Sequence, residues 1–454
     1  MEVLVSHPRP NRRDLLRIGI GALGLPTFLG LRSESARASQ ARDRSVIVLY
    51  CWGGMSHLDT WDLKPDAPAE YRGEFRPIAT ANTGIRLGEH MPLLARRTNH
   101  LAIIRSIHHR SSAHGKGMYW NFTGHPPVEA EVAVNQPPSR QDWPSLGGMI
   151  ARFRRAPAGL PSNVQIPYPM VDNNTLQAGE NAGWLGNALD PVIVRPDRGR
   201  PWGGVSRDLG TMVLNRAQGI ETGRLQARQN LVQRLESAQS RGASRSYGHF
   251  QQMAFEILLS PRVQAAFNLD LEPHALRQAY GDHICGQSVL LARRLSEAGV
   301  PCTTVICSAG DLNNASGDMW DTHSNNFNRL KNDLLPPFDR AASALLTDLA
   351  SRGRLEQTLV VFLTEFGRTP RIRSAGRDHF PHCYSVALAG CGVRGGQVYG
   401  SSDRLGATPR DLPCGPNDLH ATIFHALGLS PESQIRDHLG RNFPLSDGRV
   451  LPLF

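Results

Sequence analysis

The sequence contains very little lysine. Of its 50 basic residues only Lys64, Lys116 and Lys331 are lysines, and the others are arginines. The formal net charge is +10, but the basic residues form no cluster interleaved with aromatic residues. Such a composition reflects a general preference for arginine rather than a surface built for a polyanion, so we do not expect nucleic acid as a partner.

Paired cysteines are also missing. The seven cysteines form no CxxC pair and are odd in number. This pattern argues against a disulfide-rich scaffold and against a four-cysteine zinc site.

The sequence lacks a comfortable membrane span as well. Its N-terminal apolar run, residues 18–31, is short and bears glycines, and it follows the segment NRRDLLR and precedes Ala36-Arg37-Ala38. This layout is typical of a twin-arginine export signal over residues 1–38, cleaved after Ala38; an amphipathic surface helix is the alternative. We therefore expect the twin-arginine export machinery to deliver a mature chain with no stable membrane span to the periplasm or the exterior.

Hydrophobic residues make up 40% of the chain and charged residues 20%, as in ordinary globular proteins. Unbroken apolar runs rich in β-branched residues predict parallel strands that are covered on both faces. These runs are residues 45–51, 101–107, 302–307 and 358–364, with a further strand at 385–389. The predicted fold class is α/β, with a mostly parallel central sheet flanked by helices.

Two segments interrupt or connect these strands. Residues 161–204 are rich in proline, glycine and asparagine and predict a long surface loop, and helical patterns follow near 205–217, 222–241, 250–259 and 283–298. We therefore expect a domain over residues 45–454 with a loop and helical insertion at about 161–282. Residues 326–352 predict a long helix, broken near Pro336-Pro337, that connects two parallel strands.

Polar side chains follow the first two strands. Gly53 and Gly54 let the backbone turn sharply after the first strand, either to leave room for a ligand or only to make a turn. The second strand is followed by four histidines and several hydroxyl residues, among which Ser112 and His114 are the candidates for a nucleophile and its partner. A polar loop with capping serines is the alternative.

The densest group of chemically active residues follows the next two strands. Asp321, His323, Glu365 and His379 each lie beside a predicted strand end, with His382 close behind. Carboxylate oxygen and imidazole nitrogen together suit a divalent metal, zinc or manganese, or iron, better than calcium. In the alternative, purely structural interpretation, Glu365 pairs with an arginine and Asp321 caps the helix that follows.

This metal hypothesis has a geometric consequence. Asp321, His323 and Glu365 follow their strands, whereas His379 precedes the strand at 385–389. If His379 shares their site, that strand must begin at the same edge of the sheet and run antiparallel to its neighbours.

Several segments carry a resemblance to a known family. They are SVIVLYCWGGMSHLDTWDLKP, the WDTH element, TLVVFLTEFGRTP, GRDHFPHCYSVALAGCGVRGG and DLHATIFHALG. Together they resemble the domain of unknown function 1501 family, exported bacterial proteins placed in the alkaline phosphatase and sulfatase-like superfamily. The resemblance implies an alkaline phosphatase-like fold in which Asp321 and His323 precede a long helix, Glu365 ends a strand and His379 opens the next segment.

The chain also departs from the pattern of that superfamily. Glu365-Phe366 replaces an aspartate-histidine pair of the superfamily. The acid that usually ends the first strand is absent; Trp52 stands near its place, and Asp59 is the candidate substitute. No residue matches the superfamily nucleophile securely. These departures favour a single-metal or rearranged site over a full two-metal phosphatase site.

The sequence thus supports two functions. In the first, an exported metal-dependent hydrolase or transferase acts on a phosphate or sulfate ester of a small molecule or polysaccharide. Arg368 would then hold the oxyanion. In the second, a non-catalytic binding or assembly protein uses the same fold.

Overall fold

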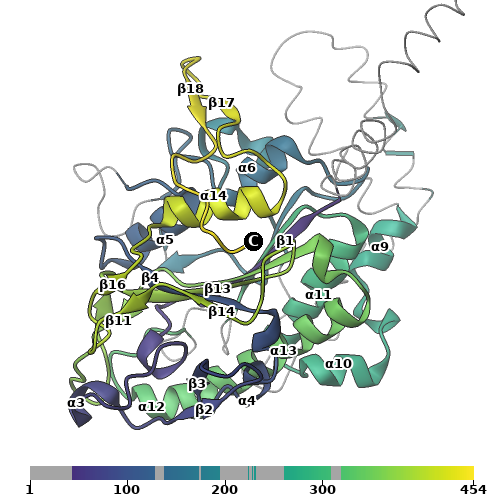
Figure 1. The fold of residues 1–454 in the computed structure, drawn as a ribbon. Coiled ribbons are helices and arrows are strands. Elements are labelled where there is room, and N and C mark those ends of the chain that lie inside the picture. The colour runs from purple at the N-terminus through teal and green to yellow at the C-terminus, as the bar shows by residue number, and fades with distance from the viewer. Residues whose placement is uncertain are drawn as a thin grey trace, which may run out of the picture. The chain divides into compact units, whose positions relative to one another are not determined.

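An eight-stranded sheet forms the centre of the molecule (Figure 1). In spatial order its strands are β14 (Gln397–Tyr399), β4 (Ala102–Ile107), β13 (Tyr384–Ala389), β10 (Thr358–Leu363), β1 (Ser45–Tyr50), β9 (Cys302–Ile306), β5 (Asn163–Ile166) and β8 (Val192–Ile193). All neighbouring pairs are parallel except those of β13, which runs antiparallel to both β10 and β4. The predicted α/β fold class with a mostly parallel sheet is confirmed.

This computed structural model describes residues 43–127, 137–172, 175–194, 260–307 and 319–454, with residues 223, 227, 228, 230 and 231. The predicted export signal, residues 1–38, and the helices predicted near 205–217 and 250–259 lie outside the described residues, as does most of the one near 222–241.

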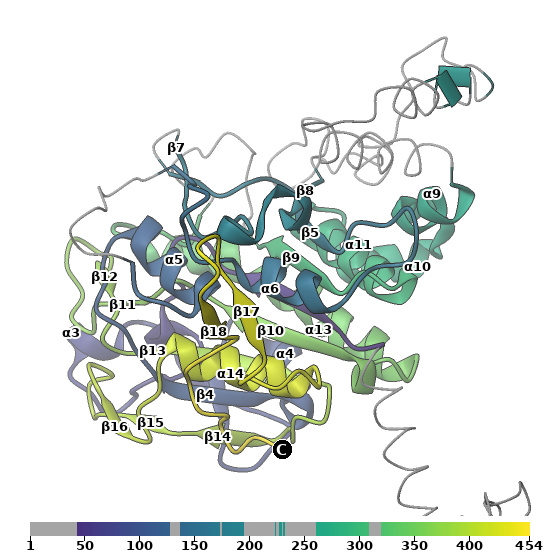
Figure 2. The same ribbon diagram turned by 90° about the horizontal axis from the view of Figure 1, so that it is seen from above.

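Alternating side chains of the strands face two layers of helices. On β1, Ile47 and Leu49 pack into the core beneath α11 (Ile284–Ala298) and α13 (Leu335–Ser351). Val48 and Tyr50 pack into the opposite core, which α5 (His114–Thr123), α6 (Leu146–Phe153) and α14 (Pro416–Ala426) cover. Figure 2 looks down on this second layer. Burying each large aliphatic side chain contributes about 1.5–3 kcal/mol, so both faces hold the sheet in place.

The chain between β9 and β10 forms the predicted helical connection. It consists of α12 (Asn326–Arg329), a π-helical turn (Leu330–Leu334) and α13. Pro336 and Pro337 fall in the first turn of α13, where a missing backbone N–H costs least. The sequence predicts a kink or break at the prolines; the chain instead stays helical, and the irregularity is the π-helical turn that precedes them.

Shorter elements surround the sheet. The remaining helices are α3 (Ala69–Arg72), α4 (Pro92–Ala95), α9 (Pro261–Phe267) and α10 (His274–Tyr280). The short strands form the pairs β2 (Pro77–Ala79) with β3 (Arg86–Gly88), β6 (Val171–Asp172) with β7 (Thr175–Leu176), β11 (Gly367–Arg368) with β12 (His379–Phe380), β15 (Ser401–Ser402) with β16 (Pro409–Asp411), and β17 (Gln434–Arg436) with β18 (Asn442–Pro444).

The loop predicted over residues 161–204 requires a correction. Residues 163–166 and 192–193 within it form β5 and β8, which extend the parallel sheet beyond β9. The segment NVQI alternates polar and apolar residues over only four positions, too few for a clear strand pattern, and its register comes from pairing with β9.

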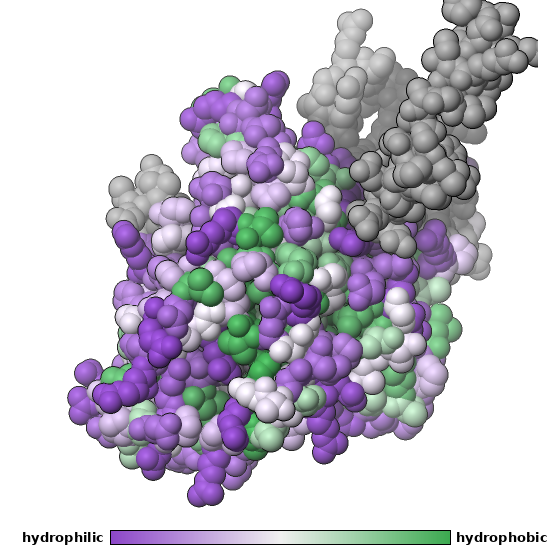
Figure 3. All heavy atoms as spheres, viewed as in Figure 1, coloured by the Kyte–Doolittle hydropathy of each residue, from purple (hydrophilic) through white to green (hydrophobic). Residues whose placement is uncertain are grey.

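The surface is of ordinary character on the side that Figure 3 shows. Hydrophobic residues appear there as small patches among hydrophilic ones. Within the described residues, no helix combines the length and apolarity that crossing a membrane requires.

Candidate metal site

Loops that follow the parallel strands meet at one edge of the sheet. Glu365 follows β10, His114 opens the helix after β4, and Asp321 lies beyond β9. His379 lies on β12, before the antiparallel strand β13, and therefore reaches the same edge from the other direction. The antiparallel strand predicted from the position of His379 is confirmed.

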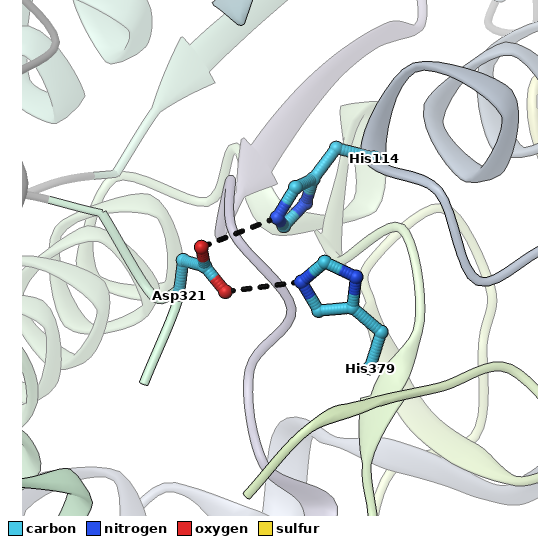
Figure 4. A group of neighbouring side chains, drawn as sticks. All are labelled: His114, Asp321 and His379. Carbon is cyan, nitrogen blue, oxygen red and sulfur yellow. Dashed lines mark hydrogen bonds and ion pairs between the residues drawn. The ribbon is translucent and has the colours of Figure 1, made fainter. Parts of the chain in front are cut away.

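Three side chains converge closely at this edge. One ligand atom each of His114, Asp321 and His379 lies within 4.8 Å of the others (Figure 4). The Nε2 atom of His114 is 3.4 Å from Oδ2 of Asp321, and Nε2 of His379 is 3.1 Å from Oδ1. We call these three residues the metal group, because two imidazole nitrogens and a carboxylate at such separations suit a single divalent cation.

His323 lies beside the metal group. Its Nε2 atom is 3.2 Å from Oδ1 of Asp321 and 2.9 Å from Nε2 of His379. His323 is the most exposed of the three histidines, with 46% of its side-chain surface accessible. It is therefore placed to be a fourth ligand or to bind a molecule at the open side of the cation.

The opposite nitrogen of each imidazole faces an oxygen acceptor. Nδ1 of His379 donates to the backbone carbonyl of Ser112 at 2.7 Å, and Nδ1 of His114 is 2.7 Å from Oε1 of Glu365. Nδ1 of His323 is 2.8 Å from Oδ1 of Asp378. Protons on the three Nδ1 atoms leave Nε2 as the metal-binding nitrogen, the arrangement that outer partners impose on metal-ligating histidines.

This arrangement calls for a positive charge between the imidazoles. Two unprotonated Nε2 atoms 2.9 Å apart, in His323 and His379, repel each other unless a proton or a cation lies between or beside them. The Nε2 atom of His114 is buried, and the acceptor facing it, Oδ2 of Asp321, is 3.4 Å away. A divalent cation would satisfy all three nitrogens and Asp321, so the residues present fit a metal.

The pKa values of the group support the same interpretation. Burial lowers the pKa of His114, but its interactions with Asp321 and Glu365 outweigh burial and raise the pKa to about 9. Burial and the positive charges of His114 and Arg368 hold the pKa of His379 below its usual value, although Asp321 opposes them. Burial raises the pKa of Asp321, but His114, His379 and Arg368 lower it much further. The group thus keeps an ionised carboxylate, and a proton occupies His114 where a cation would replace it.

Glu365 lies behind His114. It is fully buried, and Oε1 accepts from the backbone N–H of Gly53 at 2.7 Å as well as contacting His114, while Oε2 accepts from the hydroxyl of Tyr50 at 3.0 Å. Of the predicted ligands, Glu365 is thus placed to orient a ligand rather than to contact the cation.

Arg368 holds the backbone around the site through hydrogen bonds. Its Nε donates to the carbonyl of Gly54 at 2.9 Å, and its terminal nitrogens donate to the carbonyls of Gly53, Trp320 and Arg377. One of them also contacts Oδ1 of Asp321 at 2.6 Å. The predicted role in holding a substrate oxyanion does not match this geometry, because the buried guanidinium already serves protein acceptors.

The glycine turn after β1 is part of this construction. At Gly53 φ is +114°, and a Cβ atom there would lie 2.5 Å from the backbone nitrogen of Asp321. The two interpretations of the glycines therefore combine, because the turn is what lets the backbone approach the site closely.

Asp59 lies outside the metal group. Both of its oxygens contact the guanidinium of Arg377, at 2.9 and 3.2 Å, and Oδ2 also accepts from Ser56 and Asn326. The structure does not bring Asp59 into the metal group, so its prediction as a ligand is corrected: a buried arginine neutralises it. The alternative pairings of Glu365 with Arg368 or Arg377 are not the ones formed.

Of the remaining predicted residues, one lies in the metal group and the others lie outside it. His114, predicted as a partner of a nucleophile, belongs to the metal group, whereas Ser112 contributes its backbone carbonyl to His379. His382 is exposed and packs against Phe380. The sequence interpretation missed Tyr50 and Asp378, although Asp378 directly precedes His379 and could have been noticed there.

Several solved structures are distantly similar to this chain. The PsFucS1 sulfatase from Pseudoalteromonas sp. is 11% identical with a TM-score of 0.35, covering 87% of this chain and 70% of that chain. The phosphonate monoester hydrolase SpPMH from Silicibacter pomeroyi is 12% identical with a TM-score of 0.35, covering 90% and 75%. Ps i-CgsB in complex with k-i-k-neocarrahexaose is 10% identical with a TM-score of 0.40, covering 85% and 72%.

At these values the likeness carries no statement about the activity of this chain. No curated protein matches the chain. A family profile, however, matches residues 43–453, nearly the whole of the described molecule. The chain belongs to the family described as protein of unknown function (DUF1501).

Proposed function

We propose that this protein is an exported, metal-dependent hydrolase or transferase acting on a phosphate or sulfate ester. His114, Asp321 and His379 would hold a divalent cation, zinc or manganese, with His323 at its open side. The observation that supports this proposal most strongly is the convergence of three imidazole Nε2 atoms on one carboxylate, each with its Nδ1 held by an oxygen.

A cation bound there would polarise an ester oxygen and favour ionisation of a water or hydroxyl. The chain's own residues supply the frame. Glu365 fixes the ring of His114, and the carbonyl of Ser112 fixes the ring of His379. Arg368 holds Asp321 against the glycine turn. In the hydrolytic reaction the oxygen of water forms a bond to phosphorus or sulfur, the ester bond to that atom breaks, and the organic alcohol leaves with a proton.

Export remains part of the proposal. It rests on the twin-arginine pattern of residues 1–38, and the periplasm or the exterior is the proposed location. Expression of the full chain with Arg12 and Arg13 changed to lysine should keep the protein in the cytoplasm, as cell fractionation would show.

A second candidate is a binding or assembly protein that keeps the metal without turnover. It is favoured by the placement of Arg368, whose guanidinium binds protein acceptors and is not free for a substrate oxyanion.

One experiment separates the two candidates. Elemental analysis of the purified mature protein should find about one divalent metal per chain, and p-nitrophenyl phosphate or p-nitrophenyl sulfate should be turned over. His379→Ala should abolish both, whereas His382→Ala, which changes an exposed histidine outside the metal group, should keep both. Metal without turnover of either ester supports the binding protein, and a metal-free inert protein contradicts the enzyme.

A further inference from the structure

A cavity of about 760 Å³ is lined by the segment that leads from β4 into α5 and by α5 itself. Ser112 lines this cavity and also binds Nδ1 of His379 through its carbonyl, so cavity and metal group share one stretch of backbone. The volume lies within the range of small-molecule sites, about 300–1,000 Å³. A molecule in the cavity would therefore contact the backbone segment that also holds His379.

The charged side chains that line the cavity are basic. Among the described residues its lining includes Arg110 and Lys116 and no carboxylate. Neither side chain forms an ion pair or a hydrogen bond with the described part of the chain, in contrast to the buried Arg368 and Arg377, which are held by acceptors on all sides. Two unpaired cations in one cavity favour an anionic ligand.

An aromatic side chain completes the lining. Trp120 borders the cavity, and its indole is stacked on the imidazole of His109 with ring centroids 5.3 Å apart and planes 27° apart. The stacking fixes the indole, so the ring is a rigid apolar surface beside the two cations.

The helix α5 connects the cavity to the metal group. Lys116 and Trp120 are four residues apart and share one face of the helix, whereas His114, two residues before Lys116, points to the other side and contacts Asp321. One short helix thus presents a metal ligand on one face and a cation with an aromatic ring on the other.

We propose that this cavity binds the organic part of the ester, and that this part is an acidic sugar. The apolar face of a sugar ring would pack on Trp120, and a sulfate or carboxylate on that sugar would bind between Arg110 and Lys116. The inference rests on the proposed function for its assignment as a substrate site, but binding itself does not depend on turnover.

Direct binding tests this inference. The purified protein would be titrated calorimetrically with a sulfated disaccharide, a uronic acid disaccharide, a neutral disaccharide of the same linkage, and inorganic sulfate. We expect both acidic disaccharides to bind at least about tenfold more tightly than the neutral one, the effect of one charge-assisted contact. Inorganic sulfate should bind more weakly than either acidic sugar, because it lacks the ring that Trp120 contacts.

Variants identify the site. Lys116→Ala and Arg110→Ala should each weaken binding of the acidic disaccharides about tenfold, Lys116→Arg should retain it, and Lys331→Ala, which changes an exposed lysine outside the cavity, should leave it unchanged. Trp120→Phe should bind more tightly than Trp120→Leu, and thermal unfolding would verify that both variants are folded.

Each result bears on one claim. Equal affinity for acidic and neutral sugars, or unchanged binding in both charge variants, overturns the acidic-sugar site even if aryl esters are turned over. Selective binding without any turnover upholds the site and instead removes the proposed hydrolase function.

Discussion

Two aspartates at the same edge of the sheet have opposite surroundings. Asp59 is fully buried, and Arg377, Ser56 and Asn326 satisfy its oxygens. Asp321 keeps 33% of its side-chain surface exposed and faces the imidazoles of His114, His323 and His379. Both carboxylates contact a buried arginine, so the comparison teaches that a carboxylate near a strand end is a candidate ligand when imidazoles also face it.

The largest effect should follow from breaking the buried pair. Asp59→Ala leaves the guanidinium of Arg377 buried without its counter-ion, which costs about 3–5 kcal/mol in the free energy of unfolding. Urea unfolding would measure the loss. Asp411→Ala, which removes an exposed surface pair with Arg410, is the control and should change the free energy of unfolding very little. A loss at Asp59 as small as at Asp411 would contradict the structural role.

The complementary change should affect metal binding more than folding. Asp321→Asn removes the charge that three imidazoles share, so metal affinity should fall by more than the roughly 10–100-fold typical of outer partners. Unfolding of the metal-free protein should lose less free energy than in Asp59→Ala, because Arg368 keeps its backbone acceptors, although it and protonated His114 each lose a charged partner. Competition with a chromogenic chelator would give the affinity. Unchanged affinity would show that Asp321 and Asp59 are alike after all.

The free energy of unfolding of the metal-free protein should also depend on pH, because His114 changes its protonation state. The pKa of His114 rises to about 9 in the folded chain, above its value of about 6.5 in the unfolded chain. Its protonated form therefore stabilises the fold fully below pH of about 6.5, and this contribution, on the order of 3 kcal/mol, is lost as pH rises through about 9.

Chemical unfolding of the chelated protein at several pH values would follow this loss. His114→Gln should flatten the profile in that range, and an equally steep profile in this variant would assign the pH dependence to another residue. Saturating metal should suppress the effect as well, because the cation replaces the proton.

The smallest effect should come from the outer partner of His114. Glu365→Gln keeps the shape of the side chain but removes the charge that orients the imidazole, so metal affinity should fall about 10–100-fold. Tyr50→Phe removes only the hydroxyl that donates to Glu365 and should cost less. A larger loss in Tyr50→Phe than in Glu365→Gln would contradict this order.

Most strands of the central sheet could be predicted from the sequence. Apolar runs identified β1, β4, β9 and β10, because buried parallel strands need such runs on both faces. The position of His379 before its strand even predicted that β13 runs antiparallel. The short strand β5 escaped prediction because its register depends on β9 and not on its own four residues.

The site was harder to predict in detail. Asp321, His323 and His379 were recognised from residue type and place, and the structure brings them together. The partner of Asp59 could not be foreseen, because Arg377 reaches it from a distant loop. His114 was identified among four histidines as a catalytic candidate together with Ser112. Its place in the metal group depends on the start of α5, which directs its imidazole to Asp321.

The most direct test is a crystal structure of the protein purified with its native metal, with anomalous scattering used to locate the ion. We expect one peak at about 2.0–2.2 Å from Nε2 of His114, Nε2 of His379 and an oxygen of Asp321. A metal-loaded protein with the peak elsewhere, or a metal-free protein in which His323 and His379 still touch, would contradict the account.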